Sequence, residues 1–154
     1  MKKKRVVIIS LLLLLVSVIG ISSYFLFKDK INLLDVDHSA VDWNGKKQKD
    51  TSGEENTIAI PGFEKVTLYA NETTQAVNFH NPEINDCYFK ISLIHPDGSV
   101  LWISDLIEPG KGMYSIELEK TLAVGEYENA VLKYECFSLN DQSPLNGSEI
   151  NFKL

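Results

Sequence analysis

The stretch Cys87–Ser104 has the sequence CYFKISLI-HPDG-SVLWIS, and its pattern decides the fold class. Every second residue from Cys87 to Leu93 is apolar, which is the period of a strand with one buried face. The next four residues favour a tight turn, because proline presets φ and glycine adopts the left-handed conformation. The stretch therefore predicts two antiparallel strands. The returning strand 99–104 leaves two inward pairs open: Leu101 with Ile103, or Val100 with Trp102.

Similar short runs, separated by turn residues, fill the chain on both sides of this hairpin. We expect further strands at 57–60, 65–70, 74–79, 113–119, 129–138 and 149–154. In the run 113–119 the alternation places Tyr114, Ile116 and Leu118 on the inner face. Strands at this spacing indicate an all-β fold, an antiparallel β-sandwich of about seven to eight strands over residues 57–154.

A local motif precedes the strand expected at 129–138. The residues Leu122-Ala-Val-Gly125-Glu-Tyr127 resemble the corner before strand F of immunoglobulin-like and fibronectin-type domains, where a tyrosine hydroxyl bonds back to nearby backbone. The resemblance implies a structural role for Tyr127 and Gly125 in an immunoglobulin-like sandwich. No cysteine follows Tyr127 by two residues, so the domain departs from the antibody type.

The N-terminus has the composition of a membrane anchor. Residues 1–5 carry four positive charges, and Val6–Phe27 contains no charged side chain. A bilayer core requires about 20 apolar residues of helix. The excess of positive charge predicts a cytoplasmic N-terminus and an extracellular domain, and hence a single-pass protein of the cell membrane. The alternative is a cleaved signal peptide cut after Ser22, which would release a secreted module.

Residues 28–56 are mostly polar and lack a sustained period, so we expect a flexible stalk. The alternative rests on the apolar residues Ile31–Val36 and on Trp43. These residues would either continue the membrane helix or dock on the domain.

Several short strings together resemble a group of small anchored surface proteins of Gram-positive, Clostridia-like bacteria. The resemblance implies the location and the fold, and it carries over no catalytic residue. The strings are Ile60-Pro-Gly-Phe63, Asn81-Pro-Glu83, Cys87-Tyr-Phe89, Asp97-Gly98, Leu101-Trp102, Glu108-Pro-Gly-Lys111, Gly125-Glu-Tyr127, Tyr134-Glu-Cys136 and Leu145-Asn-Gly147.

Cys87 and Cys136 are the only cysteines. An even number in an oxidising compartment favours a disulfide, and each lies on the apolar side of its expected strand. The alternative is two buried thiols that act as small apolar side chains.

The cluster Asn81, Glu83, Asn85 and Asp86 is the densest set of oxygen ligands, and we weigh a calcium site there against a plain turn. We expect no other metal site, since His38, His80 and His95 lack ligand spacing. Tyr88 and Trp102 form a possible binding surface if both face outward. The alternative places Trp102 in the core.

Charge and motifs exclude several functions. Residues 57–154 hold six lysines against 14 acidic residues, a net charge of −8, so we expect no nucleic-acid partner. No nucleophile elbow or phosphate loop is present. We therefore predict a non-enzymatic chain without cofactor or catalytic residues, a surface interaction or adhesion module that binds a protein or a wall component. The alternative is an accessory subunit of a membrane complex.

Overall fold

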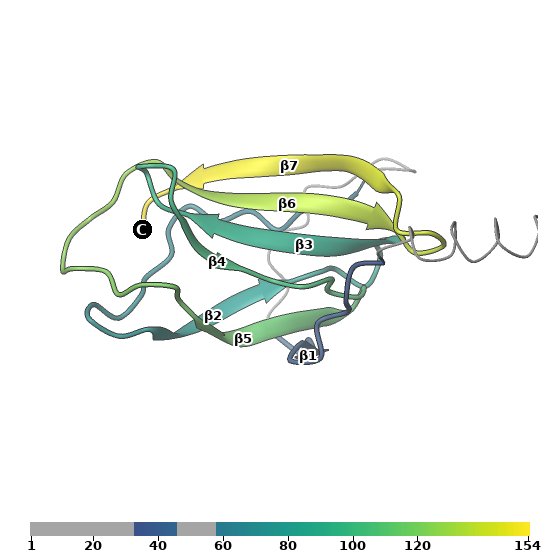
Figure 1. Ribbon diagram of the computed structural model, residues 1–154, viewed down its shortest axis with the longest axis horizontal. Coiled ribbons are helices and arrows are strands. Elements are labelled where there is room, and N and C mark those ends of the chain that lie inside the picture. Colours follow the sequence, from purple (N-terminus) through teal and green to yellow (C-terminus); the bar gives the residue numbers. More distant parts are fainter. Residues whose placement is uncertain (1–32, 46–57) are drawn as a thin grey trace, which may run out of the picture. The chain divides into compact units, whose positions relative to one another are not determined.

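The computed structural model describes residues 33–45 and 58–154. These residues form seven strands and no helix, arranged as two antiparallel sheets that pack face to face (Figure 1). The predicted all-β antiparallel sandwich is confirmed. The strands are β1 (Val41–Asp42), β2 (Thr74–His80), β3 (Cys87–Ile94), β4 (Val100–Ile103), β5 (Lys111–Glu117), β6 (Ala130–Ser138) and β7 (Pro144–Phe152).

The pairing of β3 with β6 is the longest regular ladder. It runs through eight consecutive pairs, from Cys87 opposite Ser138 to Ile94 opposite Val131, without a register shift. The pairings of β2 with β5, β3 with β4 and β6 with β7 each contain an irregularity. Buried residues alternate along β6 and, apart from Ser92, along β3. This pattern explains the difference, because a shift by one residue would turn the buried side chains to solvent.

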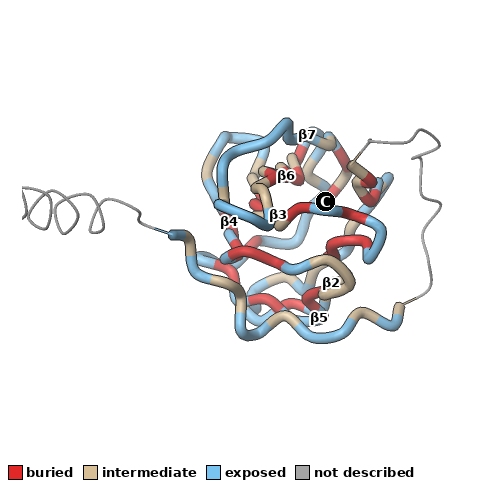
Figure 2. Tube along the Cα trace, turned by 90° about the vertical axis from the view of Figure 1, so that its right-hand side faces the viewer, coloured by how far each residue is buried: buried red, intermediate tan, exposed pale blue. Residues whose placement is uncertain are grey.

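The two sheets have the orders β1-β5-β2 and β4-β3-β6-β7. Their facing sides enclose one apolar core, and the buried positions follow the strands of both sheets (Figure 2). Phe89, Ile91 and Leu93 of β3 are completely buried. Aromatic rings cross the interior, with Phe79 of β2 5.9 Å from Trp102 of β4 between ring centroids.

The hairpin between β3 and β4 forms as predicted. Gly98 has a φ of +85°, and the Gly98 N–H donates to the His95 carbonyl at 2.8 Å. Neither expected inward pair of β4 is correct, because the ladder shifts register next to Ile94. Leu101 and Trp102 are both buried as a result, whereas Val100 and Ile103 are nearly half exposed.

The expected strands at 57–60 and 65–70 are wrong over the residues described. Residues 58–70 form no strand there and make only an isolated bridge from Lys65 to Lys153. Pro61 offers no N–H to a ladder, which disfavours pairing. The segment instead packs its apolar side chains on the core, as Phe63 does edge-on against Phe79 at 5.6 Å.

Two further expectations need correction in β5 and β7. Ile116 is buried as predicted, but Tyr114 is 37% exposed, because the β2–β5 ladder is irregular between Ala76 and Phe79. β7 begins at Pro144 rather than at Glu149 and contains a bulge at Gly147. A Cβ at Gly147 would collide with the Tyr134 carbonyl oxygen, so the bulge requires glycine.

The expected flexible stalk is wrong for residues 34–45, which belong to the same compact unit as the rest of the domain. We call this segment the strap. Val36 bridges Leu106 in parallel, and β1 pairs with β5. The side chain of Gln142 accepts a hydrogen bond from the Leu34 N–H at 2.6 Å and donates one to its carbonyl at 3.0 Å. Docking on the domain, the second possibility for these residues, is therefore the observed one.

Trp43 anchors the C-terminal end of the strap. Its indole stacks on the His80 ring at 3.9 Å with 10° between planes, and Nε1 donates to Asn78 Oδ1 at 2.7 Å. A Cβ on Gly112 would lie 2.9 Å from Trp43 Cδ1, so the glycine makes room for the ring. The strap is thus held by backbone pairing and by one large aromatic anchor.

The expected membrane segment 6–27, the basic end 1–5 and the rest of the stalk (28–32 and 46–56) lie outside the described residues. Among residues 33–45 and 58–154, the structure contains no helix long and apolar enough to cross a bilayer.

Replacing Trp43 by alanine should release the strap. We expect Trp43→Ala to lower the free energy of unfolding by about 2 kcal/mol, because a half-buried indole and its hydrogen bond are lost. Urea denaturation followed by circular dichroism measures the loss, and limited proteolysis should now cut within residues 34–45. Val41→Ala, at a position 51% exposed, is the matched control. Equal stability of both variants would show that Trp43 does not anchor the strap.

Candidate functional site

A pronounced hollow lies between the strap and the turn that joins β2 to β3. We call it the Trp43 cleft. Its volume is about 760 Å³. It is lined by Asp42, Trp43, Asn44, Gly45, His80, Pro82, Glu83, Ile84, Pro109 and Gly110.

The cleft combines an aromatic wall, an apolar rim and acidic groups. The stacked Trp43 and His80 rings contribute the wall, and Ile84 is 75% exposed at the rim. The Lys111 ammonium binds the Asp42 carboxylate, and this hydrogen bond and charge hold the pKa of Asp42 below its usual range. Glu83 adds a second, exposed carboxyl group.

This arrangement suits binding better than proton transfer. A general base works best with a pKa near the working pH, and Asp42 is shifted in the opposite direction by its partner Lys111. The residues lining the cleft include no serine, cysteine or lysine that a base could activate. Apolar and aromatic surface beside a few polar groups is typical of recognition sites.

The calcium candidate borders this cleft, and its two asparagines are structural. Asn81 Nδ2 donates to the carbonyls of Cys87 at 2.8 Å and Ile107 at 3.0 Å. Asn85 Nδ2 donates to Asn81 Oδ1 at 2.8 Å and to the Ala59 carbonyl at 2.9 Å. Asn85 Oδ1 accepts the Ala59 N–H at 2.7 Å.

Both amide oxygens are therefore engaged by N–H donors inside the protein, and both side chains are buried. Glu83 and Asp86 point to the exposed side of the turn. The four residues do not converge as oxygen ligands, and the turn alternative describes them better. The described part of the chain also holds no group of three His, Cys, Asp or Glu side chains that could bind a metal.

Cys87 and Cys136 lie side by side on the interior face, each 1% exposed, but as thiols rather than as a disulfide. Cys136 is opposite Phe89, and Cys87 is opposite Ser138, so the cysteines are diagonal neighbours. Such neighbours are about 7–8 Å apart between Cα atoms, beyond the usual disulfide range of about 4.4–6.8 Å. A hydrogen bond to Cys87 raises the pKa of Cys136, and burial adds to the rise.

Tyr88 and Trp102 do not form an exposed pair. Trp102 is 8% exposed and lies opposite Leu93 on the inner face of the sheet. Tyr88 lies opposite Phe137 on the outer face. The alternative with Trp102 in the core is the observed one, because the β3–β4 register fixes its side.

The corner motif forms as the resemblance implies. The Tyr127 hydroxyl donates to the Ala123 carbonyl at 2.9 Å. A Cβ on Gly125 would lie 3.7 Å from the Tyr127 ring, so the glycine packs beside it. Tyr127 also exchanges two backbone hydrogen bonds with Leu154, which ties the C-terminus to the start of β6.

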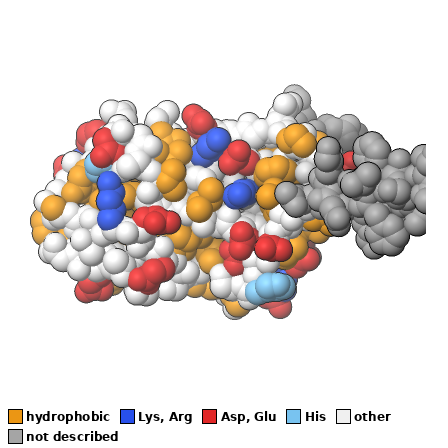
Figure 3. All heavy atoms as spheres, in the orientation of Figure 1, with side chains coloured by type: hydrophobic (Ala, Val, Ile, Leu, Met, Phe, Trp, Pro, Cys, Tyr) orange, Lys and Arg blue, Asp and Glu red, His pale blue; other side chains and the backbone are white. Residues whose placement is uncertain are grey.

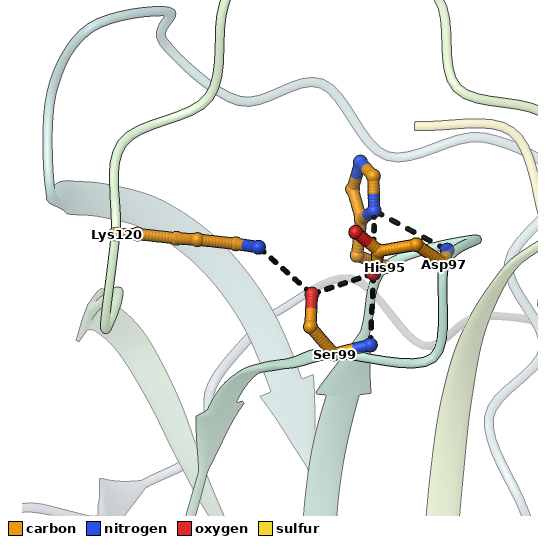
Figure 4. Close-up of polar contacts among 4 residues, drawn as sticks. All are labelled: His95, Asp97, Ser99 and Lys120. Atoms are coloured by element: carbon orange, nitrogen blue, oxygen red, sulfur yellow. Dashed lines mark hydrogen bonds and ion pairs between the residues drawn. The ribbon is translucent and has the colours of Figure 1, made fainter.

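A serine, a histidine and an aspartate do meet in the turn between β3 and β4 (Figure 4). Ser99 Oγ donates to Asp97 Oδ1 at 2.6 Å, and Lys120 Nζ donates to Ser99 Oγ at 2.8 Å. His95 Nδ1 lies 2.9 Å from the same carboxylate. The Ser99 hydroxyl and N–H, together with His95, hold the pKa of Asp97 far below its usual range. The serine proton thus points to the carboxylate rather than to a histidine, which favours a turn cap over an activated nucleophile.

Sequence reasoning missed Trp43 and His80 as site residues. The one available signal was a tryptophan in a polar segment, followed two residues later by glycine. A Cβ on Gly45 would lie 2.8 Å from the Trp43 ring, so this spacing lets the chain cross close to the indole.

Comparison with protein-family models finds no family that matches the chain, and comparisons with curated proteins and with solved structures find no match.

The Asn85 amide should matter for stability and not for calcium. Asn85→Ala removes three hydrogen bonds and leaves buried partners unsatisfied, so we expect a loss of about 2–3 kcal/mol. Thermal unfolding measures it, with the exposed Glu83→Ala as control. Millimolar calcium should leave the Tm of the wild type unchanged. A Tm that calcium raises in the wild type and not in Asn85→Ala would restore the metal site.

The cysteines should titrate as two thiols after unfolding. Because both are buried, we expect a maleimide to label neither in the native chain and both in denaturant without reductant. Mass spectrometry counts the adducts. Absence of labelling in denaturant, restored by a reductant, would instead show that the diagonal pair closes into a disulfide.

Proposed function

We propose that this chain is a non-enzymatic interaction module of the cell surface, anchored by residues 6–27, with an immunoglobulin-like domain. The sheet order β4-β3-β6-β7 and the tyrosine corner before β6 support that fold. The 22 uncharged residues support the anchor, and the resemblance to anchored surface proteins agrees with the location.

The position of the Trp43 cleft is the observation that carries this proposal. The start of β3 lies beside the end of β6, since Cys87 pairs with Ser138. The β2–β3 turn that lines the cleft is therefore at the same end of the sandwich as the β6–β7 turn. Gln142 of that turn binds Leu34, where the strap begins.

A docked strap shortens the expected tether considerably. Between Phe27 and the strap only residues 28–33 remain, and six residues span at most about 20 Å. On this proposal a short tether of that length joins the start of the strap to the anchor. A protein partner beside the membrane fits that short tether better than a distant wall component, which favours the role of an accessory or partner-binding subunit.

The chemistry of the cleft suits a peptide surface. Ile84, 75% exposed, offers an apolar contact, and the Glu83 and Asp42 carboxylates offer acceptors for cationic or N–H groups. The wall of stacked rings is already fixed by Gly112 and Asn78, so binding would cost little reorganisation.

A photo-crosslinking amino acid at position 84 tests the proposal in intact cells. We expect a discrete adduct with a membrane protein from position 84 and none from position 124, which is 85% exposed but lies in the β5–β6 loop away from the cleft. A C-terminal tag removed by external protease would establish the outward topology in the same cells. No adduct at 84, or equal adducts at both positions, would contradict the role of the cleft.

An anchor exchange separates the cleft from the membrane segment. The exchange should replace residues 1–32, because Leu34 and Val36 already bind the domain. An unchanged adduct at position 84 supports recognition by the cleft. Its loss would assign the partner contact to the exchanged segment instead.

A further inference from the structure

The outer face of the sheet β4-β3-β6-β7 carries an ordered pattern of side chains. Hydrophobic residues occupy both ends of the strands, and charged residues lie between them (Figure 3). One apolar end consists of Ile94, Val131 and Val100, with Ile103 beside them. The other consists of Tyr88, Phe137 and Pro144.

The charged middle has both signs in neighbouring strands. Lys90 of β3 lies opposite Glu135 of β6, and Lys133 of β6 lies opposite Glu149 of β7. Lys133 Nζ also lies 3.4 Å from Glu135 Oε1, and these two side chains are 37% and 40% exposed. The charges are therefore available to a second molecule while they balance each other within the sheet.

The apolar ends remain accessible in the described chain. Val100 and Ile103, the first and last residues of β4, are 45% and 46% exposed. The strap pairs with β5 and Leu106, and Phe63 packs against Phe79, so these contacts lie away from the outer face. At its start the strap also binds Gln142, in the β6–β7 turn. A row of half-exposed aliphatic side chains beside balanced charges is typical of a surface that contacts a partner.

We propose that this outer face binds the same face of a second copy of the chain, in a parallel dimer with a two-fold axis along the strands. This axis lies between the two faces and runs along the midline between β3 and β6. Rotation about it therefore places β3 of one copy over β6 of the other. Lys90 then faces Glu135 of the second copy, and Ile94 faces Val131. Tyr88 faces Phe137 in the same way, so each kind of residue meets its complement.

The parallel direction follows from the proposed anchor, on which this one step rests. Both copies of an anchored chain have Leu34 toward the same bilayer, and an axis along the strands keeps those ends together. An axis across the strands would place the anchors at opposite ends and would pair Glu135 with Lys133 of the second copy. The two arrangements therefore use different ion pairs.

The small size of the face predicts that two copies associate weakly in solution and more strongly when both are anchored in one membrane. From Ile94 to Tyr88 the strand extends about 20 Å, and four strands span about 15 Å. Such a contact is below the roughly 800 Å² per partner of stable complexes, so it should be transient in solution. Confinement to one bilayer raises the effective concentration to the order of millimolar, which suffices for a weak pair.

A charge exchange tests the dimer. It replaces the Lys133–Glu135 ion pair by two like charges, but both side chains are more than a third exposed, so the effect on folding should be small. The double variant Lys90→Glu/Glu135→Lys keeps the opposite charges of the cross-strand pair within each copy. The full chain, labelled at its C-terminus with a donor or an acceptor fluorophore, is reconstituted in phosphatidylcholine vesicles. Energy transfer should be similar among wild-type copies and among double-variant copies. It should fall about tenfold in the mixture of the two, where like charges face each other.

Two single variants complete the test. Ile103→Glu would face Glu149 of the second copy, and we expect it to abolish transfer, whereas Val124→Glu, at a site 85% exposed in the β5–β6 loop, should leave transfer unchanged. Equal transfer in the mixture, or no transfer among wild-type copies, would overturn the proposal. Loss of transfer among double-variant copies would overturn the parallel arrangement and indicate the axis across the strands.

Discussion

The uninterrupted ladder between β3 and β6 positions the rest of the sandwich. Its eight pairs hold Phe89, Ile91 and Leu93 against the second sheet. The other long ladders contain irregularities, so they adapt to this one. The same ladder sets Cys87 diagonally next to Cys136 and brings the β2–β3 and β6–β7 turns to one end. A shift by one residue would expose the core side chains, and this penalty fixes the register.

The chain that precedes β2 covers the open sides of the two sheets. The strap pairs with Leu106 and β5, while residues 58–68 contact Phe79 and Lys153. Sheet sides left open would expose apolar surface and unpaired backbone groups. Covering this surface and pairing these groups explains why the polar segment 34–45, expected as a stalk, packs on the domain. It also places Asp42 and Trp43 of the strap in the wall of the cleft.

Buried polar groups at the cleft serve the fold, and exposed groups remain for recognition. Asn81 and Asn85 use their amide groups to join three backbone segments, and such networks are costly when incomplete. Ile84 and Glu83 of the same turn are exposed. A rigid turn that presents an apolar side chain and a carboxylate is well suited to a binding site, because little order is lost on association.

The sequence by itself determined the all-β class, the β3–β4 hairpin, the corner at Tyr127 and the inward side of both cysteines, because these depend on alternation and on turn residues close in the chain. Only the tertiary structure decided the docking of Trp43 on His80, the burial of Trp102 and the exposure of Tyr114. Each of these depends on a bulge or on a contact between distant segments, and neither leaves a periodic signal in the sequence. The sequence also does not decide what the amides of Asn81 and Asn85 bind. The oxygens of such a turn can bind a cation or accept hydrogen bonds from the protein, and only the neighbouring segments decide between the two.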